Sequence, residues 1–270
     1  VGGSPNDTAP ADYKLVEISA ICQNCLQQTP VILSTRVAPK QLEGASTNGA
    51  LFIQVFDANG LPVAGADVHV TNTARAPYVV VDDTTGDDGY LRIVDTTTGT
   101  MSYYINVNKS GYSSDYTVVA SPGAPTPLKP PSNVVSQTIT DISFSIDRLG
   151  SLELHTISPA CSAIGSAQFN IRGEKKIAID PDVYKYDKNL TTNAGGNYSF
   201  ANFEWDKYHI GPAGVVYNLA GSIPMLPIDI TPGLAQNASI ILQPYTADSL
   251  LVNVKDAGTG LPLSDAVARL

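Results

Sequence analysis

The sequence has little charge of either sign and few basic residues. Charged residues make up 15% of its 270 residues, with 16 Lys and Arg against 25 Asp and Glu. No run of Lys or Arg occurs, so we expect no nucleic-acid partner, because phosphate binding depends on clustered cations. The same shortage argues against binding to an anionic membrane surface. The net charge of −9 favours solubility and leaves carboxylates available for calcium.

The sequence also lacks a long apolar run. No stretch approaches the ~18 apolar residues that a membrane-spanning helix requires. The chain begins at Val1 rather than at Met, so we expect this start to be a cut boundary. Any export or anchoring segment would then lie upstream, and the chain would meet a membrane only through that segment.

Cysteine is scarce, with only Cys22, Cys25 and Cys161. A lone Cys-x-x-Cys supplies two of the four ligands that structural zinc needs. No strand–helix–strand pattern surrounds it, which argues against a redox motif. Three interpretations stay open: a disulfide between Cys22 and Cys25 or from one of them to Cys161, free thiols, or a metal site.

Apolar residues are plentiful, at 43% of the chain, and they alternate with polar ones. The segments FIQVF (52–56) and ADVHV (66–70) each place apolar side chains on one face of a strand. Asn59-Gly60 between them supplies the positive φ angles of a tight turn. No segment has a sustained helical period. The pattern predicts an all-β protein of tandem antiparallel β-sandwiches with about seven strands each.

An internal repeat with a period near one hundred residues organises the chain. Gly60-Leu61-Pro62 recurs as Gly260-Leu261-Pro262, and a weaker middle copy begins near Ser151. The repeat predicts four regions: a connector over 1–45, a first sandwich over 46–148, a second over 149–246, and a third repeat that starts at 247–270. Within the first, the Pro-rich stretch 121–133 is expected to be a stiff exposed loop. Because two strands cannot bury a core, we expect the polypeptide to continue past Leu270.

Three segments carry a family resemblance: FIQVFDANGLPVAGADVHV (52–70), DDTTGDDGYLRIVD (82–95) and YYINVNKSGY (103–112). They resemble the carboxypeptidase regulatory-like and Cna-B-like family, over roughly residues 49–270. The resemblance implies an Ig-like or transthyretin-like sandwich that serves as a spacer, adhesin or carbohydrate-binding-like module. Many such modules form a Lys–Asn isopeptide bond, but the expected first strands, 51–56 and 152–157, carry no Lys.

A second resemblance concerns the start of the chain. The segment GGSPNDTAPADYKLVEISA (2–20) resembles the last loop and strand of prepilin-type proteins. This resemblance implies a pilin-like remnant whose long hydrophobic helix would lie upstream. Some relatives bind calcium in this loop, which here contains Asp7 and Asp12.

One acidic turn is a speculative metal site. Asp82, Asp83, Asp87 and Asp88 lie close together in the sequence, and carboxylate oxygens are the ligands that calcium prefers. Their spacing does not match an EF-hand loop, so a solvated acidic turn is the alternative. Apart from this calcium possibility, no cofactor is expected.

The aromatic and imidazole side chains have structural interpretations. Three histidines lie in separate expected strands without a serine or cysteine partner pattern, so we expect no catalytic site and no enzyme: His69, His155 and His209. Four tyrosines can pack across strands or stack on sugar rings: Tyr103, Tyr104, Tyr112 and Tyr116. The single Trp, Trp205, is expected in the core of the second module.

These observations predict a non-catalytic extracellular structural or adhesive protein, such as a subunit or stalk of a bacterial surface filament. Its expected partners are copies of itself, other surface or filament subunits, and a glycan or host-surface ligand. The alternative is a carbohydrate-binding-like accessory module of an exported enzyme or transporter. A third interpretation, an accessory domain of a peptidase, needs a zinc-ligand motif that the sequence does not contain.

Overall fold

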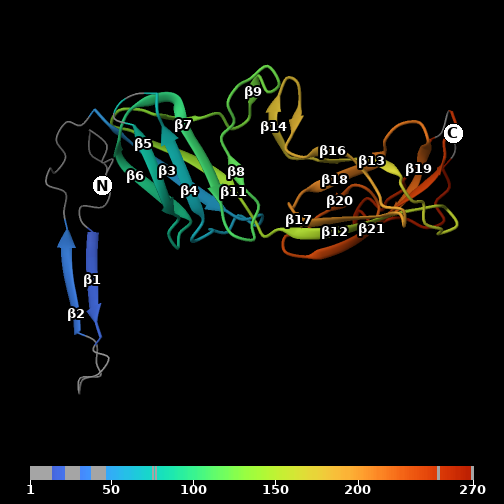
Figure 1. The fold of residues 1–270 in the computed structure, drawn as a ribbon, viewed down its shortest axis with the longest axis horizontal. Helices are drawn as coiled ribbons and strands as arrows, with labels where there is room; N and C mark the ends of the chain where they lie inside the picture. Colours follow the sequence, from blue (N-terminus) through green and yellow to red (C-terminus); the bar gives the residue numbers. More distant parts are fainter. Residues whose placement is uncertain are drawn as a thin grey trace.

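The protein is known from a computed structural model, which describes residues 14–21, 31–37, 47–74, 76, 78–247 and 250–268. Within these residues the regular elements are the strands β1 to β21, and no helix occurs. The prediction of an all-β protein built from tandem β-sandwiches is confirmed. Two sandwiches follow one another along the long axis of the molecule (Figure 1).

The first sandwich consists of two facing sheets. One has the order β11-β3-β6, and the other has the order β10-β7-β4-β5 with β8 paired to β7. Its strands, with the outlying β9, are β3 (Gly49–Phe56), β4 (Asp67–Asn72), β5 (Val79–Thr84), β6 (Tyr90–Thr96), β7 (Gly99–Asn108), β8 (Asp115–Tyr116), β9 (Thr126–Pro127), β10 (Ser132–Val134) and β11 (Ile139–Ser145).

The second sandwich repeats this arrangement, with sheets of order β17-β12-β21-β19 and β16-β13-β18-β20. A separate three-stranded sheet has the order β15-β14-β9. The strands are β12 (Gly150–Ile157), β13 (Gln168–Gly173), β14 (Lys176–Ile179), β15 (Val183–Tyr184), β16 (Asp187–Thr191), β17 (Asn197–Phe203), β18 (Lys207–Pro212), β19 (Tyr217–Ile223), β20 (Ile228–Asp229) and β21 (Ala235–Pro244).

Each sandwich contains one parallel pair in addition to its antiparallel pairs. The last long strand lies parallel to the first, as β11 beside β3 and β21 beside β12. Between these two strands the chain also forms the facing sheet of the same sandwich, and it then returns to pair with its first strand. Alternation within single strands does not reveal this long-range pairing, which is why the sequence predicted antiparallel sheets only.

The cores follow from the alternation. In β3, Leu51, Ile53 and Val55 point inward and are fully buried. Ala66 is also fully buried, and its small side chain allows the two sheets to approach closely. One hydrophobic cluster draws on residues between 51 and 146, and a second on residues between 152 and 242. The domain boundaries given above stay a prediction.

A similar hairpin opens each repeat. Isolated bridges join Phe56 to Pro62, Ile157 to Ala163, and Lys255 to Pro262. Gly60 has a φ of 78°, as the expected turn requires, but Asn59 does not have the positive φ that was also expected of it. The third hairpin exposes apolar side chains, including Leu250 and Leu263, at positions that are buried in the first repeat.

The start of the described chain is a two-stranded ribbon. Strands β1 (Lys14–Ala20) and β2 (Val31–Val37) pair antiparallel, and they belong to no larger sheet (Figure 1). The described residues include no helix that is long and apolar enough to cross a membrane.

Candidate functional site

The two sandwiches meet at a joint without a free linker. Strand β11 ends at Ser145 and β12 begins at Gly150, so residues 146–149 make the whole connection. Ile146 is fully buried and belongs to the core of the first sandwich. The backbone therefore passes from one core to the next within a few residues.

Asp147 fixes this connection to the first sandwich. Its side chain is mostly buried, and Oδ2 accepts a hydrogen bond from the Ala58 amide at 3.1 Å. Its carbonyl accepts a bond from the Ser113 amide at 2.8 Å. Its own amide donates to the Ser113 hydroxyl at 3.2 Å. A buried carboxylate requires such partners, so this residue holds three loops together.

Leu149 bonds the connection to the first sandwich, and Arg148 bonds it to the second. The Leu149 amide donates to the Gly111 carbonyl of the first sandwich at 2.9 Å. The Arg148 carbonyl accepts a bond from the Gly233 amide of the second sandwich at 3.2 Å. A hydrogen bond to the Tyr112 side chain raises the pKa of the Arg148 guanidinium. The connection is thus bonded to both modules rather than spanning a gap.

We use the word crossing for each contact that runs from one sandwich to the other, and the 146–149 connection is the first. The Pro-rich stretch 121–133 makes a second crossing. It was expected to be an exposed loop, but its strand β9 leaves the first sandwich and pairs with β14 of the second, Pro127 opposite Ala178. The Leu128 amide donates to the Ile177 carbonyl at 3.0 Å. The stretch therefore adds an edge strand to the β14–β15 sheet (Figure 1). Its proline content suits an edge strand, because Pro lacks a backbone donor.

A third crossing is a hydrogen bond from a lysine of the second sandwich to a backbone carbonyl of the first. Lys185 Nζ lies 2.8 Å from Glu204 Oε1 and also donates to the Ser114 carbonyl of the first sandwich. Lys175 Nζ lies 2.9 Å from the same Glu204 oxygen. Burial lowers the pKa of Lys175, although Glu204 opposes this effect. One carboxylate therefore holds two ammonium groups beside the joint, and nothing in the sequence indicated this pairing.

Trp205 lies next to these groups rather than in the core where we expected it. Lys175 Nζ is 3.2 Å from the centre of its ring, a cation–π arrangement. The indole is half-buried, and its Nε1 has no hydrogen-bond partner among the described residues. The side chain covers the buried lysine instead of joining the main cluster of the second sandwich.

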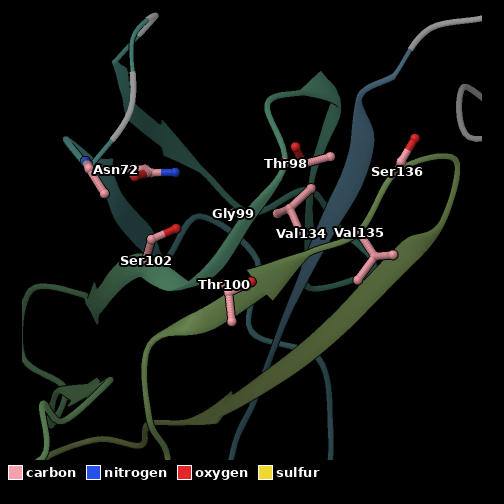
Figure 2. Close-up of a pocket in the computed structure, with 9 residues that line it drawn as sticks. Asn72, Thr98, Gly99, Thr100, Ser102, Val134, Val135 and Ser136 are labelled. Atoms are coloured by element: carbon pink, nitrogen blue, oxygen red, sulfur yellow. Dashed lines mark hydrogen bonds between the residues drawn. The ribbon is translucent and has the colours of Figure 1, made fainter.

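An open hollow of about 550 Å³ lies beside the start of β7, and Figure 2 shows its lining. Its described lining carries hydroxyl, amide and methyl groups, and none of these lining residues is charged. The lining residues are Asn72, Ala74, Thr98, Gly99, Thr100, Ser102, Val134, Val135 and Ser136.

A buried serine borders this hollow. Ser102 Oγ is buried without a hydrogen-bond partner in the described residues. A Cβ at position 99 would approach this oxygen to 2.2 Å, so a larger residue there would force the Ser102 side chain to move. The hollow offers hydrogen-bonding groups but neither a titratable pair nor an aromatic surface.

The four acidic residues proposed for calcium point to separate partners. Asp82 bonds His69 Nδ1, and Asp88 Oδ2 lies 2.7 Å from Arg92 Nη2. The hydrogen bond from Arg92 lowers the pKa of Asp88. Asp83 accepts a bond from the Thr84 amide at 2.8 Å, and Asp87 is exposed in the turn.

Calcium binding gains no support from this geometry. Among the described residues, no group of three or more His, Cys, Asp or Glu side chains is placed to hold a metal. Asp7 and Asp12 lie outside the described residues. The calcium sites therefore stay predictions.

The cysteine predictions are tested only in part of the chain. Cys161 is exposed in the turn that opens the second repeat. Cys22 and Cys25 lie outside the described residues. The choice among a disulfide, free thiols and a metal site stays open.

The histidines lie apart on three strands. His69 bonds Asp82, His155 Nδ1 lies 2.7 Å from Asn197 Oδ1, and His209 Nε2 lies 2.9 Å from Glu174 Oε1. Each imidazole thus bonds an acid or an amide rather than a hydroxyl or thiol. This arrangement lacks the nucleophile–base contact that a hydrolase uses.

The comparisons with known proteins give fold-level similarities only. No family model and no curated protein matches the chain. The TIE protein of Bacillus anthracis is 16% identical, with a TM-score of 0.31, and the match covers 86% of this chain and 41% of that one. This chain thus spans about two fifths of that protein's length.

Two pilins are also similar. A streptococcal ancillary pilin is 11% identical with a TM-score of 0.30, and the match covers 85% of this chain and 75% of that one. The minor pilin of Streptococcus agalactiae is 12% identical with a TM-score of 0.32, and the match covers 75% of this chain and 99% of that one. Identities and scores this low carry no argument about function.

Proposed function

We propose that the chain is a non-catalytic structural protein of the cell exterior, in which rigidly joined sandwiches act as a spacer within a stalk or pilus-like filament. One observation carries this proposal: the two modules are joined by three independent crossings and no free linker. The crossings are the 146–149 connection, the β9–β14 ladder and the Lys185–Ser114 contact.

The mechanical reasoning is as follows. Modules in one chain move relative to one another unless their contact is extensive. Here the core of the first sandwich extends into the connection through Ile146, and strand β9 of the first module adds an edge strand to the β14–β15 sheet of the second. Such a joint keeps the distance and orientation between the ends of the pair constant. A spacer needs this property, whereas an enzyme does not.

We propose that assembly with other chains uses edge strands of the sheets that do not take part in the joint. Strand β5 is an edge of its sheet, and Val80, together with Tyr78 next to the strand, is well exposed there. An edge strand with exposed apolar side chains can pair with another chain. We propose copies of this chain or other surface subunits as the partners.

The test is to locate and image the native protein. We expect protease treatment of intact host cells to release fragments of this chain, identified by mass spectrometry, while a cytoplasmic marker stays protected. We also expect negative-stain images of sheared material to show regular stalks or filaments that contain the chain. A chain that is protected inside intact cells, or present only as dispersed particles, would contradict the proposal.

The alternative of a carbohydrate-binding accessory module has one specific observation in its favour. A hollow flanked by two tyrosines lies on the outer face of the first sandwich. Binding there is compatible with a structural role, since adhesins combine both.

A further inference from the structure

A row of polar side chains crosses the outer face of the first sandwich. The registers place Asp82 of β5 opposite His69 of β4, His69 opposite Asn106 of β7, and Asn106 opposite Tyr116 of β8. Residues directly opposite in adjacent strands share a face of the sheet. The row therefore presents a carboxylate, an imidazole, an amide and a phenol in sequence.

A second tyrosine completes a hollow beside this row. Thr71 lies opposite Tyr104 one step along the same strands. The hollow has a volume of about 210 Å³. Its lining residues are His69, Thr71, Tyr104, Ile105, Asn106, Tyr116 and Thr117.

The outward side chains contribute little to the core. Tyr104 is 40% exposed and Asn106 is exposed, whereas Tyr103, Ile105 and Val107 alternate with them and are buried. Cross-strand packing explains part of the contact between neighbours. It does not explain why hydrogen-bonding groups occupy the floor between two aromatic rings.

The floor offers donors and acceptors at fixed positions. His69 Nδ1 bonds Asp82, which orients the ring and leaves Nε2 available for a ligand. The side-chain amide of Asn106 has no partner among the described residues, so it can both donate and accept. None of the described residues that line the hollow is Lys or Arg, and the nearby carboxylate is already bonded to His69.

We propose that this face binds one ring of a neutral saccharide chain. A sugar ring has an apolar C–H face, which suits a tyrosine ring, and hydroxyl groups, which suit the imidazole and amide. The volume falls below the ~300–1,000 Å³ of sites that enclose a small ligand. The hollow therefore holds a single ring of an extended polymer whose neighbouring rings stay in solvent.

The second sandwich provides an internal comparison. Asn170 of β13 takes the place of His69, opposite Asn189 on one side and Gly211 on the other. Its amide bonds Asn189 Oδ1 at 3.0 Å and Asp187 Oδ1 at 2.8 Å, so that face satisfies its own polar groups. No tyrosine pair and no strand equivalent to β8 occur there in the described residues. The fold thus does not require the features that form the saccharide site.

The test titrates the purified full chain with three neutral hexasaccharides: cellohexaose, maltohexaose and the hexamer of N-acetylglucosamine. Isotope-edited NMR would follow the amide signals. We expect at least one sugar to shift signals of β4, β7 and β8, with a dissociation constant on the order of 1 mM, as suits a small open site. Tyr104→Ala and Tyr116→Ala should each weaken binding by about five- to tenfold.

Two further variants complete the design. Asn106→Ala should also weaken binding, and it leaves both aromatic rings in place. Tyr245→Ala removes a tyrosine of the second module that is 50% exposed, and it should not change the affinity. Shifts elsewhere, equal affinity of all variants, or no binding of any of the three sugars would overturn the proposal. Because this experiment uses purified protein, its outcome is independent of where the chain resides in the cell.

Discussion

Tyr208 is the most thoroughly enclosed phenol of the second sandwich. It is 1% exposed, and its hydroxyl donates to the Glu204 carbonyl at 3.1 Å. Phe203 stacks on it with ring centres 4.3 Å apart, and Tyr186 meets it edge-on at 5.8 Å. Burial raises the pKa of this phenol far above its usual range, and the charges of Asp206 and Glu204 add to the effect.

This raised pKa predicts a loss of stability in alkali. Above pH ~10 the unfolded chain releases the Tyr208 proton while the folded chain retains it, so the free energy of unfolding falls as pH rises. The contribution is at most ~1.4 kcal/mol per pH unit. Denaturant unfolding from pH 9 to 11.5 should show a shallower decline for Tyr208→Phe than for the native chain.

A control isolates the contribution of this phenol. Tyr78 is 67% exposed, so Tyr78→Phe should leave the slope unchanged. At pH 7, Tyr208→Phe should also cost about 1 kcal/mol because its hydrogen bond is lost. An unchanged slope in Tyr208→Phe would show that this phenol ionises as readily in the folded chain as in the unfolded one.

Individual residues were predictable from the sequence only where the information is local. Gly60 and Ala66 follow from one hairpin, and the structure places them as that hairpin requires. Tyr104 and Tyr116 belonged to a group of four tyrosines for which cross-strand packing and sugar stacking were both open, and the sequence could not separate them from the buried Tyr103. Which tyrosine faces outward depends on register, and register is a property of paired strands.

At the scale of elements, one turn recurs in both sandwiches. Gly89 and Gly196 have φ angles of 73° and 76°. Each amide donates to a carbonyl three residues earlier, and each carbonyl accepts from the first strand of its module, at Val55 and at Thr156. This turn follows Thr84-Thr85 in the first sandwich and Thr191-Thr192 in the second, and in each it joins the two facing sheets.

This turn predicts unequal costs for two glycine substitutions. A Cβ at Gly89 would lie 2.6 Å from the Val55 carbonyl oxygen, whereas a Cβ at Gly60 meets nothing within 4 Å. Both positions have positive φ, so Gly60→Ala should cost ~1 kcal/mol from conformation alone. Gly89→Ala should cost about 2 kcal/mol or more, because the overlap adds to it. Denaturation midpoints of the two variants would compare these costs, and equal values would contradict the close approach.

The sequence did not allow us to predict which strands pair when they lie far apart along the chain. Alternating apolar residues and turn signals predicted the sandwiches, because both signals lie within a few residues. The parallel pairing of β3 with β11 joins segments about ninety positions apart in the sequence, and β9 pairs with β14 across modules. The Pro-rich stretch has the composition of an exposed loop, so only the approach of the second sandwich shows that it is a strand.

At the scale of the whole molecule, we expect the joint to make the two modules behave as one body. The β9–β14 ladder joins strands other than β11 and β12, which the backbone connection at 146–149 links, and Lys185 adds a bond to Ser114, next to the Ser113 that bonds Asp147. Attachment at separate points resists bending in a way that a single covalent connection does not. The native pair should therefore tumble with one rotational correlation time, measurable by ¹⁵N relaxation on amides of both modules.

Removing the two outlying crossings should release the joint. Leu128→Pro deletes the amide that bonds Ile177, and Lys185→Met deletes the cation that reaches Ser114. The Leu128 bond is worth about 1 kcal/mol. Losing Lys185 also removes one ammonium partner of Glu204, but Lys175 keeps that carboxylate paired, so both modules should stay folded. In the double variant, the two modules should show shorter and unequal correlation times.

A matched control tests whether the crossings themselves matter. Val119 is 56% exposed, close to the 54% of Leu128, and its amide has no partner among the described residues. Lys188 is an exposed lysine of the second module that makes no contact across the joint. The combination Val119→Pro with Lys188→Met should therefore tumble like the native chain. If the native modules already tumble independently, the joint is not rigid, and the spacer function loses the observation on which it rests.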